Sequence, residues 1–163
     1  MIEAYGSSKL YKFIHLPIQS GSDSVLRSMH RNYMVEEVIC YMRELREKIS
    51  GISIEADIII GYSTETDADF EAMINFLEEI KPSITNVSKF SLRPHAPASR
   101  LNQPPSGLIE ARSIEASRRE RRMQYEEHSK LMGTVEQVTI TKNARSSTGR
   151  DDYYMEVVYN HNL

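Results

Sequence analysis

Three polar stretches, each directly after an apolar run, hold the side chains of this sequence best suited to bind a ligand. They are 15–22 (His-Leu-Pro-Ile-Gln-Ser-Gly-Ser), 61–66 (Gly-Tyr-Ser-Thr-Glu-Thr) and 90–97 (Phe-Ser-Leu-Arg-Pro-His-Ala-Pro). Glutamine and serine side chains hydrogen-bond hydroxyl and amide groups. Asp57 lies inside the apolar run before the second stretch and needs a partner: a ligand hydroxyl, a ligand ammonium, strand backbone or a lysine. Taken singly, each stretch is explained by a turn or a helix start. When the three stretches are considered together, a shared ligand site explains them as well as turns and helix starts do.

The inventory of catalytic groups is small. The five histidines are scattered, without the His-x3-His spacing of a metal site. The single cysteine, Cys40, excludes a disulfide framework and any multi-cysteine zinc or iron–sulfur site built from this chain alone. Its place at the edge of an apolar helical stripe predicts a small core residue. Neither a glycine-rich phosphate loop nor a nucleophile elbow occurs, so we assign no catalytic and no metal-binding residue.

The elements that position these stretches follow from the hydrophobic periodicity. Short apolar runs at 11–16, 52–60 and 84–90 predict strands. Apolar residues at steps of three and four predict helices over 35–49 and 66–80, the second capped by its first residue, a threonine. The alternation indicates a parallel α/β sheet or barrel with right-handed crossovers, in which ligands collect at the carboxyl ends of the strands. Three strands are too few to close a barrel, so we expect half of one.

After residue 90 the pattern changes. Four prolines and a glycine between residues 94 and 107 mark an irregular, extended connection. Residues 108–131 are charge-rich with few apolar side chains, which predicts an exposed connector helix. The arginine-rich run 118–122 wraps around this helix rather than lining one face, so a solvated surface is favoured over a nucleic-acid stripe.

The C-terminal segment predicts β-structure. Residues 134–141 alternate as a strand, 143–150 are expected to form a loop, and 152–159 form a second strand. Because two strands cannot bury a core, we expect the beginning of an incomplete small β-barrel. The predicted division of the chain is an α/β unit at 1–107, a connector helix at 108–133 and a partial β domain at 134–163.

The composition is that of an ordinary soluble globular protein. The 163 residues are 40% hydrophobic and 26% charged, with a formal net charge of −3, which excludes a disordered or fibrous class. Residues 34–80 hold 3 basic and 12 acidic side chains, whereas 81–122 hold 9 basic and 3 acidic ones. The basic segment suits an anionic partner, although solvated faces are the simpler explanation. No apolar run approaches the roughly 20 residues of a membrane span and no signal-peptide pattern opens the chain, so we expect no membrane partner and a cytoplasmic location.

Four segments in this order resemble a known family. The segments HLPIQSGSDSVLRSMHR (15–31), ADIIIGYSTETDADFEAM (56–73) and KFSLRPHAPASR (89–100) resemble the second half of the radical S-adenosylmethionine barrel of the methylthiotransferases. The segment TVEQVTITKNARSSTGRDDYYMEVV (134–158) resembles the start of the TRAM domain, a small β-barrel that binds tRNA. These enzymes attach a methylthio group to a tRNA adenosine beside the anticodon, or in one branch to a ribosomal protein. They use S-adenosylmethionine and 4Fe-4S clusters.

The resemblance implies roles for individual residues. Gln19, Ser20 and Asp57 are expected to line the S-adenosylmethionine pocket, and the backbone near Gly61 and 90–92 is expected to frame the adenine. The implied cofactor-site residues are therefore Gln19, Ser20, Asp57, Gly61, Phe90 and Leu92. Those implied to face tRNA, through phosphate contacts, are Arg93, Arg118, Arg122 and Lys142.

The sequence departs from the family pattern at two loops and in its cysteines. The family has Phe-Pro where this chain has Tyr62-Ser63, and Arg-Pro-Gly-Thr-Pro at 93–97, where this chain has Arg-Pro-His-Ala-Pro. The family's Cys-x3-Cys-x2-Cys loop and three further cysteines are not in this chain. We therefore expect a fragment of a larger enzyme, inactive alone. The Thr-Glu-Thr loop and the strand at 87–90 favour the branch that acts on N6-threonylcarbamoyladenosine.

Two other readings stay open. One is a non-catalytic RNA-binding or interaction module that uses the basic stretch and the β-strands. The other, an unrelated aldolase-like barrel fragment, has little support because no lysine stands at a strand end for Schiff-base chemistry. The open edge of a half-barrel also predicts self-association.

Overall fold

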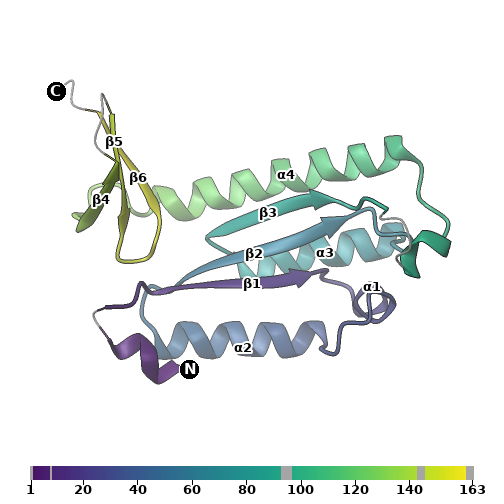
Figure 1. The fold of residues 1–163 in the computed structure, drawn as a ribbon, viewed down its shortest axis with the longest axis horizontal. Coiled ribbons are helices and arrows are strands. Elements are labelled where there is room, and N and C mark those ends of the chain that lie inside the picture. Colours follow the sequence, from purple (N-terminus) through teal and green to yellow (C-terminus); the bar gives the residue numbers. More distant parts are fainter. Residues whose placement is uncertain (1, 8, 93–96, 143–145, 161–163) are drawn as a thin grey trace.

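The structure is a computed structural model that describes residues 2–7, 9–92, 97–142 and 146–160. Its elements form a three-stranded parallel sheet, a set of helices packed on that sheet and a separate antiparallel sheet (Figure 1). In chain order they are η1 (Ile2–Gly6), β1 (Phe13–Gln19), α1 (Asp23–Ser28), α2 (Val35–Lys48), β2 (Ser53–Ile60), α3 (Asp67–Ile80), β3 (Ile84–Lys89), η2 (Pro97–Arg100), α4 (Ser106–Ser129), β4 (Val138–Lys142), β5 (Ser146–Asp151) and β6 (Glu156–Asn160).

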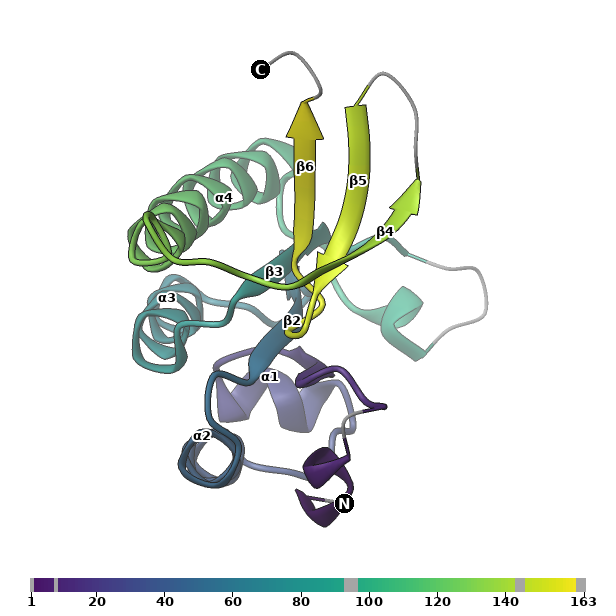
Figure 2. The ribbon, with the colours of Figure 1, turned by 90° about the vertical axis from the view of Figure 1, so that its left-hand side faces the viewer.

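The parallel sheet has the order β1-β2-β3, and α2, α3 and α4 lie on one side of it (Figure 2). Alternation along the central strand β2 decides which side chains meet the helices. Ile54, Ile58 and Ile60 are fully buried in the core beneath the helices, whereas Glu55 and Asp57 lie on the opposite face. The three predicted strands and their parallel alternation with helices are confirmed. The half-barrel itself stays a prediction.

Two predicted helices are confirmed, with small differences at their ends. The Thr66 hydroxyl accepts a hydrogen bond from the Asp69 amide at 3.2 Å and caps α3. The predicted core face of α3 is buried, as is that of α2. The prediction that Cys40 is a core residue is wrong. Cys40 is exposed on α2, with its Sγ 3.6 Å from a carboxylate oxygen of Glu36 one turn earlier, because the rotation of about 100° per residue carries it past the edge of the buried stripe.

Helix α4 is more than the exposed connector that its polar composition predicts. Ala116 is fully buried, and Arg112 and Glu120 are also buried, on the side of α4 that packs against β3 and α3. These three residues are spaced by four, so they lie on one helix face. A small residue between two long polar ones lets the helix approach the sheet without an apolar stripe. The spacing of these residues therefore indicates a packed face of α4 that the polar composition of the helix conceals.

The prediction of two C-terminal strands joined by a loop over 143–150 is wrong. β5 covers Ser146–Asp151 and pairs antiparallel with both β4 and β6, so the described residues form a three-stranded sheet. The predicted second strand begins only at Glu156. The preceding turn is held by the Asp151 carboxylate, which accepts hydrogen bonds from the amides of Tyr153 and Met155 at 2.9 and 2.8 Å. Because the β5 sequence is polar, it carries no apolar alternation to reveal a strand.

No helix within the described ranges is long and apolar enough to cross a membrane. The incomplete small β-barrel and the three-part division of the chain stay predictions.

Candidate ligand site at the strand ends

A bulge in β1 sets the backbone of the first predicted site residue. The pairing of β1 with β2 runs regularly to Leu16, which faces Ala56, and then shifts so that Gln19 faces Ile58. Pro17 lies in the interruption, where a residue without an N–H group cannot contribute to the ladder. Beyond the bulge Gln19 takes a left-handed backbone conformation, with φ of 72°. Such strained positions in non-glycine residues often mark functional sites.

Three of the six predicted cofactor-site residues line one open cleft. Its volume is about 680 Å³, within the usual range for small-molecule sites. Gln19 comes from the end of β1, Asp57 from the exposed face of β2 and Phe90 from the residue after β3, so consecutive strands each supply one side chain. Further lining residues are Ile58, Ile59, Asn86, Ser88, Lys89, Ser91 and Ala98.

The carboxylate of Asp57 has two side-chain partners on neighbouring strands. One oxygen lies 2.9 Å from Nε2 of His15 on β1, and the other accepts a hydrogen bond from the Asn86 amide on β3 at 2.8 Å. The same Asn86 amide donates to Glu55 at 2.7 Å. The partner of Asp57 is thus neither backbone nor a lysine. Asp57 retains 31% side-chain exposure, so a ligand can reach it.

Sequence reasoning missed His15, Glu55 and Asn86 as a group. The signal was the strand register, because His15 faces Glu55 across β1 and β2, and Asn86 faces Asp57 across β2 and β3. Nitrogen and oxygen atoms of His15, Glu55 and Asp57 lie within 4.8 Å of one another, which is a donor set of the kind that binds divalent cations. His15 already pairs with Asp57, and the Asn86 amide donates to both carboxylates.

The other three predicted cofactor-site residues do not line this cleft. Ser20 is buried, and its hydroxyl accepts a hydrogen bond from the Ser22 amide at 3.2 Å, which is a turn contact. Gly61 lies beneath Ile109 of α4. Leu92 is exposed beyond the end of β3. Ser20 and Gly61 therefore belong to the framework of the loops, at the same edge of the sheet.

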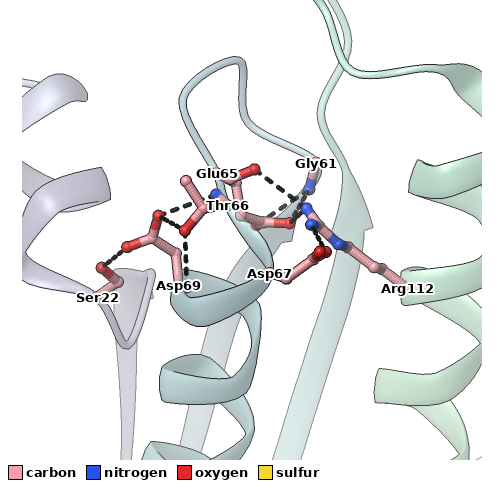
Figure 3. A network of polar contacts seen from close by, with 7 residues as sticks. All are labelled: Ser22, Gly61, Glu65, Thr66, Asp67, Asp69 and Arg112. Carbon is pink, nitrogen blue, oxygen red and sulfur yellow. Dashed lines mark hydrogen bonds and ion pairs between the residues drawn. The ribbon is translucent and has the colours of Figure 1, made fainter.

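The loops around the cleft are joined by a polar network (Figure 3). The Asp69 carboxylate accepts hydrogen bonds from the hydroxyls of Ser22, in the loop after β1, and Ser24, in the first turn of α1. It also accepts from the hydroxyl and amide of Thr66, at the end of the loop after β2 (the β2 loop, 61–66). Partial burial opposes ionisation, but these hydrogen bonds outweigh it and hold the pKa of Asp69 well below its usual range. A single carboxylate thus fixes the start of α1 against the start of α3.

Curated relatives match nearly the whole chain. A probable threonylcarbamoyladenosine tRNA methylthiotransferase of Methanothermobacter thermautotrophicus is 38% identical over 97% of the chain, and the human threonylcarbamoyladenosine tRNA methylthiotransferase is 32% identical over 97%. A tRNA-2-methylthio-N(6)-dimethylallyladenosine synthase of Ehrlichia ruminantium is 36% identical over 89%. The chain is homologous to the tRNA methylthiotransferases over nearly its whole length. It spans between 28% and 38% of the length of these relatives. No protein-family model matches the chain.

This similarity to the methylthiotransferases confirms the resemblance drawn from the motifs. The Tyr62-Ser63 departure has a structural counterpart. The Tyr62 ring packs edge-on against Phe90, with centroids 4.9 Å apart, and its hydroxyl donates to the Ser28 carbonyl at 3.0 Å. Ser63 accepts a hydrogen bond from Gln103. The loop is therefore anchored without the proline that the family pattern has there.

The residues predicted to face tRNA are only partly brought together. Arg118 and Arg122 are 73% and 82% exposed on α4 and pair with Glu115 and Glu126 at 2.7 and 3.0 Å. Together with Arg119 they line one open groove beside α3, because residues spaced by three and four share a face. Arg121, the fourth arginine of the run, is exposed but does not line this groove, so the run as a whole does not form one stripe. Lys142 is exposed on β4. Arg93 lies outside the described residues.

Proposed function

We propose that this chain is the S-adenosylmethionine-binding part of a tRNA methylthiotransferase that modifies an adenosine beside the anticodon. The observation that carries the proposal is the cleft at the strand ends, where Gln19, Asp57 and Phe90 meet from three consecutive strands. Ligands of parallel α/β sheets collect at this edge. Carboxylate, amide and aromatic groups in one cleft suit a ligand that has an ammonium group, hydroxyls and a purine.

Each lining residue has a chemical task in this proposal. Asp57, held in place by His15 and Asn86, accepts hydrogen bonds from ribose hydroxyls or from the ammonium group of the ligand. The Gln19 amide both donates and accepts, and it orients the amino-acid end. Phe90, braced by Tyr62, offers a ring face or edge to the adenine. S-adenosylmethionine supplies radical chemistry when it is bound beside a reduced iron–sulfur cluster.

The chain does not fit a cluster of its own. Its single cysteine, Cys40, is on α2 and does not line the cleft, whereas 4Fe-4S clusters are held by several cysteine thiolates. We therefore assign the chain binding and positioning but no radical step, and we propose that it is inactive alone.

The proposed substrate is a tRNA that carries N6-threonylcarbamoyladenosine. The proposal is supported by the names of the archaeal and human relatives and by the Thr-Glu-Thr loop at 64–66. Arg118, Arg122, Lys142 and Arg93 are the proposed phosphate contacts. The dimethylallyladenosine synthase relative marks the alternative substrate. A chimera tests this choice: the chain replaces the matching segment of a full-length relative, and the nucleosides of the treated tRNA are analysed by mass spectrometry. The product, methylthiolated threonylcarbamoyladenosine or methylthiolated dimethylallyladenosine, identifies the substrate.

Calorimetric titration with S-adenosylmethionine tests the proposed binding site. We expect the chain to bind, and Asp57→Asn to weaken binding about tenfold or more, because a hydrogen bond to a charged group is lost. Asp152→Asn, the same change in an exposed turn, is the matched control and leaves the affinity unchanged. A folded wild-type chain that does not bind contradicts the proposal.

An RNA-binding module without a cofactor is the second candidate, and the exposed guanidinium groups of Arg118 and Arg122 favour it. A salt-dependent gel shift with tRNA, together with no binding of S-adenosylmethionine, would support this candidate over the first.

A further inference from the structure

Helix α4 contacts the β2 loop of the candidate site at an apolar point. Gly61, the first residue after β2, has φ of 79°, a conformation that favours glycine. A Cβ atom at this position would lie 2.7 Å from side-chain carbons of Ile109, so α4 approaches the loop backbone as closely as a glycine allows. The loop and the helix are therefore packed without a gap.

A second, ionic contact lies one helical turn further along α4. Nη1 of Arg112 donates to a carboxylate oxygen of Glu65 at 2.7 Å and to the Glu65 carbonyl at 3.2 Å, and Nη2 donates to Asp67. The Arg112 and Glu65 side chains are only 6% and 2% exposed. The Glu65 carboxylate in turn accepts the Gly61 amide hydrogen, with both oxygens 3.2 Å from the nitrogen (Figure 3). Arg112 thus fixes the Glu65 carboxylate, which in turn binds the Gly61 amide.

The electrostatics of this pair depend on the hydrogen bonds. Burial raises the pKa of the Glu65 carboxyl, and hydrogen bonds from Gly61 and Arg112 oppose the rise. Burial would lower the pKa of Arg112, but hydrogen bonds to Asp67 and Glu65 outweigh it and raise the pKa. A buried carboxylate without its partner carries a large desolvation cost. The loop conformation and the Arg112 contact are therefore mutually dependent.

We propose that Arg112 is a positioning residue of the S-adenosylmethionine site and that it acts by fixing the 61–66 loop through Glu65. The inference rests on the proposed function. The fixed loop carries Tyr62, which braces Phe90 in the cleft. It also carries Thr66, which donates to the Asp69 carboxylate, and the same carboxylate accepts from Ser22 in the loop after β1 (Figure 3). Helix α4 is thereby a structural part of the ligand site, although it supplies no residue to the cleft.

The planar fork of arginine is what this position requires. Arg112 reaches Glu65 with one nitrogen and Asp67 with the other, and its guanidinium also lies 5.5 Å from the ring centroid of Phe70. A lysine is a point charge and cannot satisfy both carboxylates in this geometry. Arg112→Lys keeps the charge and removes the fork, so it isolates positioning from net charge.

Two measurements on Arg112→Lys test the inference. We expect exchange of the Gly61 amide hydrogen to speed up about tenfold, and S-adenosylmethionine binding by calorimetry to weaken about fivefold or more. Arg121→Lys on the exposed side of α4 is the matched control and changes neither quantity. Ile74→Val, in the core of α3, lowers thermal stability without touching the network and leaves the affinity within about twofold.

The outcomes separate this inference from the proposed function. Unchanged Gly61 exchange in Arg112→Lys, or an equal loss of affinity in Ile74→Val, overturns the positioning role. A wild-type chain that does not bind S-adenosylmethionine contradicts the proposed function, and Gly61 exchange then still decides whether Arg112 fixes the loop. If Arg112→Lys does not fold, Glu65→Gln replaces it, with faster Gly61 exchange and weaker binding expected because the charge on the acceptor is lost.

Discussion

The parallel sheet with its helices and the antiparallel sheet are stabilised in different ways. The first has a continuous core in which Ile54, Ile74 and Leu77 are fully buried. In the antiparallel sheet, the buried residues that the structure describes are Ser147, Gly149 and Asp151, and Ile140 and Val158 are more than half exposed. Apolar burial is the main stabilising term for the first region, whereas strand hydrogen bonds and docking hold the second.

The antiparallel sheet docks on the parallel sheet where β1 begins. The Lys12 amide donates to the Asp152 carbonyl at 2.9 Å, and the Tyr154 ring contacts the rings of Tyr11 and Phe13, with centroids 5.1 and 4.9 Å apart. The candidate ligand site lies at the opposite ends of the same strands (Figure 1). The candidate site is therefore built by the well-packed region alone, and the antiparallel sheet docks on that region far from the site.

The largest expected effect is a core truncation. We expect Leu77→Ala in α3 to lower the free energy of unfolding by about 2–5 kcal/mol, because a fully buried side chain leaves a cavity. Val158→Ala in β6, where the side chain is 57% exposed, changes it by less than about 0.5 kcal/mol. Urea denaturation measures both. Equal losses would contradict the difference between the regions.

The next effect compares two glycines. We expect Gly61→Ala to cost about 2–4 kcal/mol, because the left-handed backbone and the close approach of Ile109 both oppose a methyl group. Gly133→Ala, before the antiparallel sheet, has φ of 84° but open space, so it costs about 1 kcal/mol. Thermal unfolding measures the loss of stability in both variants, and the difference between them is the contribution of the Ile109 contact. Equal losses at both positions would show that this contact does not constrain Gly61.

A smaller effect concerns docking. We expect Tyr154→Ala to destabilise the antiparallel sheet by about 1 kcal/mol through loss of two ring contacts, and to leave the parallel sheet unchanged. Hydrogen exchange should show faster exchange in β5 and no change in β2. Tyr125→Ala, on the exposed surface of α4, is the control. Faster exchange in both sheets would show that the two regions unfold together.

The smallest effect depends on pH. Because the folded-state pKa of Asp69 is lowered, its ionised form stabilises the fold above the ordinary carboxyl pKa of about 4, and this contribution is lost as the pH falls below that value. We expect Asp69→Asn to be less stable than wild type at pH 7, and the difference to shrink below pH of about 4. Asp152→Asn should show no such convergence in pH-dependent urea denaturation. A difference that stays constant with pH would contradict the Asp69 network.

The sequence predicts the parallel region better than the antiparallel one, for a physical reason. The apolar stripes at 35–49 and 66–80 have helical period and Thr66 has a capping side chain, so these helices follow from local pattern. The β5 strand has a polar sequence, and only pairing with its neighbours makes it a strand. Local pattern does not contain the register between strands.

The candidate site shows the same limit. Gln19, Asp57 and Phe90 follow from motif resemblance and strand-end position. His15 and Asn86 become partners of Asp57 only through the register of three strands, and the Arg112–Glu65 pair joins residues 47 positions apart. The spacing of Arg112, Ala116 and Glu120 indicates a packed face of α4, but it does not say which loop that face contacts.

The most direct test of the central claim maps S-adenosylmethionine onto the chain by NMR. The account predicts that titration of the 15N-labelled protein shifts the amide signals of Gln19, Asp57 and Phe90 and leaves those of β5 in place. Shifts confined to the antiparallel sheet, or none at saturating ligand, would contradict the assignment of the cleft.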